Sequence, residues 1–244
     1  MRPRCSAAEV EVRVWVTRSQ PGADRQARIL RAAGHDPVVS PALTIAEVRG
    51  DMPPGPFTDV VFLSEHAVRL GVPRLVPEAW FSGARSYAVG ATTAKRLRAA
   101  GIGAAFPEEA SSEGLLALPE LADGRGRSVL IVGGLGGRDL LEKALTARGA
   151  RVEKLAVYQR QAVASATLNP GSVDAVAVAS GDGFAAVARL WFAAGGRGDV
   201  PVLVPSPRVA GLGAGLGFSN VYTCAGAGAD AVVEALESLS STGR

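Results

Sequence analysis

Cysteine and histidine are scarce in this chain, which has two of each among 244 residues. No Cys/His cluster or pair of carboxylates stands at metal-ligand spacing, so we expect no metal site. With His35 and His66 as its histidines, the chain also gives little support to a histidine-centred catalytic triad. Cys5 and Cys224 leave a disulfide open, but two free thiols of a cytosolic protein are the favoured interpretation.

Long hydrophobic runs are missing as well. Hydrophobic residues make up 48% of the chain, which excludes disorder, yet the longest apolar runs are of strand length and could not span a bilayer. The first twelve residues, MRPRCSAAEVEV, carry charges where a signal peptide needs an apolar stretch, so they predict a short tail before the first strand. We therefore expect a cytoplasmic protein with no membrane association and room for two modest domains.

A strong excess of charge of one sign is absent too. The 26 Lys and Arg residues against 23 Asp and Glu leave a net charge of +3, and aromatic residues make up 5%. The basic residues are spread along the chain without interleaved aromatics, so nucleic acid is not an expected partner. A small acidic ligand held in a basic cleft stays open.

What the sequence does contain is a repeated unit of strand, turn and helix. Short β-branched runs alternate with amphipathic stretches, which predicts parallel sheets covered by helices on both faces. Residues 14–41 read as strand, polar turn, helix and next strand, and residues 129–157 repeat that pattern. Gly34 and Gly149 follow the two helices, as C-terminal caps do.

A second unit type also occurs twice. Residues 59–70 and 174–190 each form a buried strand that ends in a serine, Ser64 or Ser180, at the start of a helix. These serines are most simply helix N-caps.

The order of the units predicts two domains. A third pair covers residues 87–106 and 202–224. We call the units at residues 14–41 and 129–157 the glycine-turn units, and one of them comes first in its set of three units whereas the other comes last. The second set is then inserted into the first and circularly permuted, and the two β-prone crossings suit a two-stranded ribbon. The prediction is an α/β protein with two flavodoxin-like parallel-sheet domains: residues 1–41 with 163–244, the inserted residues 49–153, and linker strands at 42–48 and 154–162.

The glycine-rich segment VLIVGGLGGRDLL, residues 129–141, has the look of a nucleotide-binding loop. The dinucleotide fingerprint fails in every frame, because Leu135 or Asp139 stands where a glycine is required, and the lysine of a P-loop is missing. The segment then predicts a strand, a tight turn and an open helix start, which can bind any anion.

Ligands of open parallel sheets bind beyond the carboxyl ends of the strands, where this chain places hydroxyls, glycine N–H groups and a few cations. With two domains facing each other, these loops are expected to line one cleft that suits an anion with several carboxylates. Other roles stay open, since Thr92 and Thr93 are good N-caps and Arg138 and Lys95 can be solvated surface residues. The candidate binding residues are Thr17, Arg18, Ser64, Gly90, Thr92, Thr93, Gly133, Gly134, Arg138, Ser180, Ser206 and Arg208.

Tyr158 is one of three tyrosines and lies on the second predicted linker strand rather than in a sheet core. That strand is expected to flank the cleft, which makes the hydroxyl a candidate functional group. Aromatic packing at the domain joint is the alternative interpretation.

Several segments together resemble the uroporphyrinogen-III synthase family. They are, in chain order, the strand ending VTR at Arg18, DVVFLSEHAV, VGATTAKRL followed by AAG, SSEGLL at residues 111–116, and the segment that ends in VYQR around Tyr158. Each motif alone is unspecific, but the likeness covers residues 12 to about 239 in the right order.

The resemblance implies two α/β domains joined by a two-stranded β-linker, with the active site between them and no metal or cofactor. It implies a lyase of porphyrin and heme biosynthesis whose substrate is hydroxymethylbilane, a linear tetrapyrrole with acetate and propionate side chains, and whose reaction inverts ring D through a spiro intermediate. Tyr158 matches the family's linker tyrosine, which the resemblance implies is the acid that donates a proton to the leaving hydroxyl. The glycine turn at residues 133–137 would present N–H groups to substrate carboxylates, and a monomer is the default expectation.

The last unit departs from the family pattern. Where family members often have a glycine followed by paired threonines, residues 204–209 read VPSPRV, so Ser206 or Arg208 would have to replace the hydroxyl pair. Leu63 and Ala179 likewise stand where a threonine often precedes the serine.

Two other functions stay open. A non-catalytic tetrapyrrole- or anion-binding regulatory protein on the same fold would bind its ligand and leave ring D unturned. A nucleotide- or sugar-phosphate-using transferase would fit the glycine-rich turns, and nucleotides would then protect it against thermal unfolding.

Overall fold

The computed structural model describes residues 11–78 and 80–242. Most of the expected N-terminal tail, with Cys5, lies outside the described residues. Contacts between Cα atoms divide the chain into two compact units, residues 1–44 with 161–244 and residues 45–160. We call them the discontinuous unit and the continuous unit.

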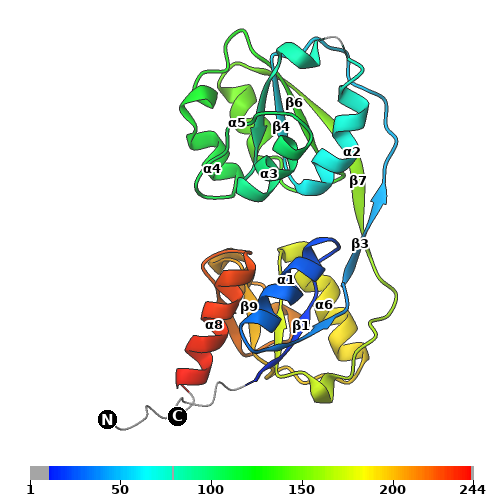
Figure 1. Ribbon diagram of the computed structural model, residues 1–244, viewed down its shortest axis with the longest axis vertical. Coiled ribbons are helices and arrows are strands. Elements are labelled where there is room, and N and C mark those ends of the chain that lie inside the picture. The colour runs from blue at the N-terminus through cyan, green and yellow to red at the C-terminus, as the bar shows by residue number, and fades with distance from the viewer. Residues whose placement is uncertain (1–10, 79, 243–244) are drawn as a thin grey trace. The chain divides into compact units, whose positions relative to one another are not determined.

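A parallel sheet forms the centre of the discontinuous unit (Figure 1). Its strands are β1 (Arg13–Val16), β2 (Asp36–Val39), β8 (Ala175–Ala177), β9 (Val202–Val204) and β10 (Val221–Thr223). Its helices are α1 (Gly22–Ala32), α6 (Gly181–Ala193), α7 (Pro207–Ala210) and α8 (Ala229–Thr242), with 3-10 turns η3 (Pro170–Ser172) and η4 (Ala214–Leu216). The strands lie in the order β10-β9-β8-β1-β2, and every neighbouring pair among them is parallel.

The continuous unit has a sheet of its own. Its strands are β4 (Asp59–Phe62), β5 (Arg85–Ala88) and β6 (Ser128–Gly134), joined by β3 (Leu43–Glu47) and β7 (Arg151–Ala162), which both run across the boundary between the units. Its helices are α2 (Glu65–Leu75), α3 (Ala91–Ala99), α4 (Ser112–Ala117) and α5 (Leu140–Ala147), with 3-10 turns η1 (Phe81–Gly83) and η2 (Pro119–Leu121). The strand order is β3-β7-β6-β4-β5.

The predicted α/β class with parallel sheets is confirmed, with one addition. Strands β4, β5, β6 and β7 pair in parallel. Strand β3 runs the other way beside β7, because Val48 N donates to Val157 O at 3.0 Å while Val163 N donates to Ala42 O at 3.1 Å. The second sheet is therefore mixed.

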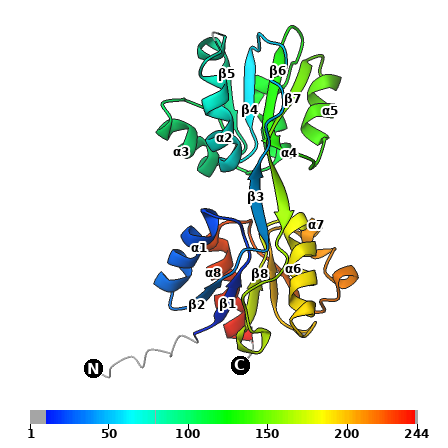
Figure 2. The ribbon, with the colours of Figure 1, turned by 90° about the vertical axis from the view of Figure 1, so that its right-hand side faces the viewer.

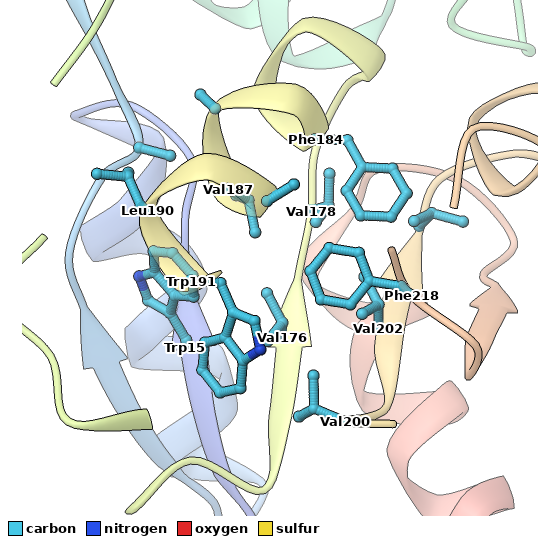
Figure 3. Packing of buried hydrophobic residues seen from close by; sticks show 14 of the residues in the cluster. Trp15, Val176, Val178, Phe184, Val187, Leu190, Trp191, Val200, Val202 and Phe218 are labelled. Carbon is cyan, nitrogen blue, oxygen red and sulfur yellow. The ribbon is translucent and has the colours of Figure 1, made fainter. Parts of the chain in front are cut away.

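Helices cover both faces of the discontinuous unit's sheet, with α1 and α8 on one face and α6 on the other (Figure 2). Successive residues of β1 consequently enter different cores. Trp15 packs with Trp191 of α6, their ring centroids 6.0 Å apart (Figure 3). Val14 and Val16 pack on the opposite face with Leu30 of α1. A strand buried on both faces needs an unbroken apolar run rather than alternation.

Strand β4 repeats this arrangement in the continuous unit. Val60 and Phe62 belong to the core beneath α2 and α3. Val61 belongs to the core beneath α4 and α5. The apolar run DVVF is thus explained by burial on both sides.

The two sheets share one strand order when equivalent units are matched. The glycine-turn units form β1–β2 and β6–β7, the serine units form β8 and β4, and the third pair forms β9 and β5. Tyr87 of β5 also makes a parallel bridge to Ala105, at the place that β10 takes beside β9. Gly34 and Gly149 have φ angles of 83° and 93°, so their predicted role after the helices is confirmed.

The described residues bear on two further expectations, the state of Cys224 and the lack of a membrane-spanning helix. Cys224 is a buried free thiol, and burial raises its pKa, so the free-thiol prediction is confirmed for this cysteine. Among the described residues, no helix is both long and apolar enough to cross a bilayer.

A buried carboxylate joins three strands of the continuous unit at the end opposite their carboxyl termini. Asp59 of β4 has a fully buried side chain, and Arg127 donates to it from Nη2 at 2.8 Å and Nε at 3.1 Å. Arg85 Nε lies 2.9 Å from Asp59 Oδ1, and Thr58 Oγ1 donates to Oδ2 at 2.6 Å. Arg127 also donates to the Tyr87 hydroxyl at 3.0 Å, and burial raises the pKa of that phenol.

Removing Asp59 is expected to destabilise the protein strongly. In Asp59→Ala the guanidinium of Arg127 stays buried without its carboxylate, which lowers the free energy of unfolding by about 3–5 kcal/mol. Denaturant unfolding followed by circular dichroism measures the change. Lys143→Ala breaks an exposed pair with Asp139 in the same unit and should leave the midpoint unchanged. Equal midpoints for the two variants would contradict the prediction.

Candidate functional site

Serine N-caps stand at the carboxyl ends of β4 and β8. Ser64 and Ser180 have extended backbone angles, and their hydroxyls accept the N–H groups of Ala67 at 3.0 Å and Gly183 at 3.1 Å. An α-helix leaves its first four N–H groups without intrahelical partners, and each serine satisfies one of them. The predicted N-cap role of both serines is confirmed.

The helix that follows β5 begins differently from the prediction. Gly90 occupies the N-cap position of α3 with an extended backbone and no side-chain cap bond. Thr92 and Thr93 lie inside the first turn, which excludes the N-cap role that stayed open for them as an alternative. Because an α-helix turns about 100° per residue, Thr92 is exposed while Thr93 is buried against the core.

Tyr158 is buried in the continuous unit. Its side chain is 1% exposed and belongs to the core beneath α2 and α3, so the expectation that it lies outside a sheet core is wrong. The reason is that β7 pairs with β6 as far as Tyr158, whose carbonyl oxygen accepts Leu135 N at 2.7 Å. The Tyr158 hydroxyl lies 3.0 Å from Ser64 Oγ and accepts a hydrogen bond from Arg160 Nη2 at 3.1 Å.

The glycine-rich segment is part strand and part turn. Gly133 and Gly134 belong to β6 rather than to the turn in which they were expected, and the turn is formed by residues 135–137, whose two glycines have positive φ angles. The register against β7 shifts between Gly133 and Gly134. A Cβ atom on Gly134 would lie 2.7 Å from Cε2 and 2.8 Å from Cζ of Tyr158. The missing side chain of Gly134 therefore makes room for the tyrosine ring.

Arg138 follows this turn and is paired. Its Nη1 lies 2.5 Å from Glu113 Oε1 and its Nη2 lies 3.1 Å from Oε2, and the pair raises the pKa of Arg138. Glu113 lies in the first turn of α4, whose N-cap Ser111 accepts Gly114 N at 2.8 Å. Both partners are about half exposed, so an incoming carboxylate could replace Glu113 at little cost.

In the discontinuous unit, Thr17 and Arg18 follow β1 and donate to backbone carbonyls. Thr17 is buried, and its hydroxyl donates to Ala177 O at 2.7 Å. Arg18 Nη1 donates to Ala227 O at 3.1 Å, in the loop before α8. Both side chains thus hold the end of β1 against neighbouring segments of the same unit.

Ser206 and Arg208 stand at the end of β9. Ser206 caps α7, accepting Val209 N at 3.4 Å, and Arg208 is exposed. A Cβ atom on Gly181, the residue after Ser180, would lie 3.7 Å from Arg208 Nη1, so Ser180 and Arg208 share one edge of the sheet. A hollow of about 370 Å³ lies beside them, lined by Gly181, Ala185, Gly211, Leu212, Gly215 and Leu216.

Two residues that lie near Tyr158 are not among the candidates that the sequence patterns predict. Arg160 lies two positions along β7, hence on the same side of the strand, with its guanidinium carbon 5.3 Å from the centroid of the Tyr158 ring. The strand period could have identified it. The His66 ring centroid lies 5.5 Å from that of Tyr158, a contact between distant segments that no local pattern announces.

This arrangement can bind anions and move a proton. Helix starts and arginines at the strand ends suit carboxylates, and a tyrosine hydroxyl between a serine and an arginine can donate. In residues 11–78 and 80–242, no three His, Cys, Asp or Glu side chains gather as metal ligands would.

These features define an α/β protein with one parallel and one mixed sheet, whose strand ends carry hydroxyls, helix starts and arginines and which holds a buried phenol. Residues 24–234 match the family model described as uroporphyrinogen-III synthase HemD. The chain is 34% identical to the uroporphyrinogen-III synthase of Salmonella typhimurium over 193 residues, 73% of this chain and 78% of that protein. It is 31% identical to the uroporphyrinogen-III synthase of Escherichia coli over 244 residues, 92% of this chain and 99% of that protein.

Two solved structures share the fold. The uroporphyrinogen-III synthetase of Helicobacter pylori superposes with a TM-score of 0.64 at 15% identity and covers 94% of this chain and 100% of its own. A mutant uroporphyrinogen III synthase of Thermus thermophilus gives 0.58 at 18% identity, covering 94% and 99%. Because the family model matches most of its length, this chain belongs to the uroporphyrinogen-III synthase family.

Placing a methyl group at Gly134 is expected to displace the Tyr158 ring. The Cβ atom of Gly134→Ala would overlap ring atoms, and such overpacking lowers the free energy of unfolding by about 1–3 kcal/mol. Denaturant unfolding measures this loss of stability. The control is Gly103→Ala, at a position where a Cβ meets no atom within 4 Å. If Gly134→Ala were as stable as that control, the close packing described here would be wrong.

Proposed function

We propose that this protein converts hydroxymethylbilane to uroporphyrinogen III with loss of water. Membership of the family carries the proposal, and the polar groups at the strand ends support it. Loss of the terminal hydroxyl converts ring A to an azafulvene. The substituted carbon of ring D then attacks this azafulvene to form a spiro intermediate. This intermediate fragments and recloses with ring D inverted. The substrate can lose its hydroxyl and close without help, so the enzyme acts chiefly by positioning.

The acetate and propionate groups of the substrate are proposed to bind at the strand ends of each unit. The starts of α2, α3 and α6 supply N–H groups and the positive ends of helix dipoles. Charge comes from arginines, of which Arg138 would exchange Glu113 for a substrate carboxylate. Gly133 and Gly134 are proposed to shape the site through β6. The other proposed binding residues are Thr17, Arg18, Ser64, Gly90, Thr92, Thr93, Ser180, Ser206 and Arg208.

Tyr158 is proposed as the acid that supplies the proton to the leaving hydroxyl. Its phenol lies 3.0 Å from the serine that begins α2, which is the edge of the sheet where open α/β sheets bind ligands. General-acid assistance is worth about 10²- to 10⁴-fold. Because this leaving group departs readily, the lower end of that range is expected.

Each unit is further proposed to be a flavodoxin-like domain. Numbered along its own chain, the discontinuous unit's sheet runs 2-1-3-4-5, the flavodoxin order. Counting the continuous unit from β6, and with the Ala105 bridge in last place, yields the same order. This supports an inserted, circularly permuted second domain at residues 49–153 within residues 1–41 and 163–244, with linker strands at 42–48 and 154–162.

The protein is proposed to work as a cytoplasmic monomer without metal, cofactor or nucleic acid. The scarcity of cysteine and histidine supports a site without metal, and basic residues spread along the chain without interleaved aromatics argue against nucleic acid.

The isomer that forms tests the proposed function. Purified protein added to freshly made hydroxymethylbilane, with no cofactor, is expected to yield mostly the type III isomer. The products are oxidised and the type I and type III porphyrins separated by chromatography. Mostly type I at the rate of buffer alone would mean that the protein binds tetrapyrroles without turning ring D.

Tyr158→Phe tests the acid role. The variant keeps the ring that fills the core and loses the donated proton, so type III formation is expected to slow about 10²-fold. Tyr222→Phe removes a hydroxyl from a partly exposed tyrosine in β10 and should react at the wild-type rate. An unchanged rate for Tyr158→Phe would remove Tyr158 from the chemistry.

A further inference from the structure

The hydroxyl of Tyr158 is poorly placed to touch a substrate directly. Its side chain is 1% exposed, and its two hydroxyl contacts are Ser64 Oγ at 3.0 Å and Arg160 Nη2 at 3.1 Å. Ser64 is partly exposed at the start of α2. A proton that leaves the phenol therefore has a short route to the edge of the sheet through Ser64.

The chemistry of the neighbours fixes the direction of one of these hydrogen bonds and allows the other to run from Tyr158 to Ser64. A guanidinium has donors and no acceptor, so Arg160 donates to the phenol oxygen and cannot take its proton. Ser64 Oγ has two lone pairs and one proton. One lone pair accepts Ala67 N–H, the other can accept the Tyr158 proton, and the serine proton then points away from both.

We propose that Ser64 relays the proton of Tyr158 to the leaving hydroxyl of the substrate, and that Arg160 stabilises the phenolate that remains. This rests on the proposed function and adds a catalytic residue and a charge to it. The C–O bond breaks with its electron pair going to oxygen, which takes the Ser64 proton and leaves as water. Ser64 takes the Tyr158 proton in the same step.

The proton is recovered at the end of the reaction. When ring D has reclosed, the pyrrole carbon loses a proton, and the electrons of its C–H bond restore the aromatic ring. That proton returns to the Tyr158 oxygen through Ser64. The enzyme thus ends in its starting state, and water is the net product besides the macrocycle.

Arg160 is suited to hold the phenolate between these two steps. Its guanidinium donates to the oxygen that becomes charged, and hydrogen bonds between ionised partners are about twice as strong as neutral ones. The guanidinium also lies against the ring face, 5.3 Å from the centroid. Arg160 is exposed at the strand end, so solvent moderates its charge.

Substitutions of Ser64 can distinguish its proposed role as a proton relay from its role as the N-cap of α2. Asparagine caps helices about as well as serine but cannot pass on a proton, whereas threonine keeps the hydroxyl. Ser64→Asn is expected to slow type III formation about 10²-fold, as Tyr158→Phe does, and Ser64→Thr to stay within a few-fold of wild type. Ser111→Asn, at a serine that caps α4, is the matched control and should keep the wild-type rate. A wild-type rate for Ser64→Asn would overturn the relay.

The double variant Ser64→Asn/Tyr158→Phe tests whether both residues serve one path. Members of one path are not additive, so the double variant should be about as slow as either single variant. A further 10²-fold loss would mean that the two act independently, and the relay would be abandoned.

The role of the Arg160 charge is tested with one variant that loses the charge and one that keeps it. Arg160→Gln keeps a donor and loses the charge, so a loss of about tenfold is expected. Arg160→Lys keeps the charge and should recover most of the rate. Equal losses in the two variants would exclude charge stabilisation of the phenolate. All these rates are compared with a wild type that forms type III, so failure of the relay is distinct from failure of the proposed function.

Discussion

Parallel pairing of strands buried on both faces is the constraint on which the rest of this structure depends. A parallel strand must return through a crossover, here usually a helix, before the next strand can pair, so every carboxyl end meets a loop and most meet a helix start. The carboxyl ends of the parallel strands in one sheet lie along one edge. This brings Ser64 and Tyr158 together from distant parts of the chain, and in the other sheet it places Arg208 beside Gly181, the residue after Ser180.

The same pairing explains why the chain can do chemistry with so few catalytic residues. Helix starts and extended N-caps present N–H groups without any particular side chain, and arginines add charge. The reaction proposed here needs a substrate held in one curled shape and one proton delivered. The ring of Tyr158 lies beside the register shift at Gly134, whose lack of a side chain leaves space for it.

Local patterns predicted the elements well and the contacts poorly. The serine caps and the glycines after helices follow from short-range hydrogen bonding and backbone freedom, and those predictions are confirmed for Ser64, Ser180, Gly34 and Gly149. The alternative N-cap role of Thr92 is excluded, because Gly90 takes the N-cap position with no side-chain bond. The turn prediction placed Gly133 outside the strand because glycine usually interrupts β structure.

Local sequence patterns were enough to predict the α/β class, the repeated units and which residues stand near strand ends, since each depends on the periodicity and hydrogen bonding of neighbouring residues. The tertiary structure alone decided that Tyr158 is buried, that Arg160 donates to its hydroxyl, and that Arg138 is paired with Glu113. Those outcomes depend on which strand pairs beside which and on a register shift at one glycine. Strand pairing and register are set by contacts between segments far apart in the chain, about which local propensity carries no information.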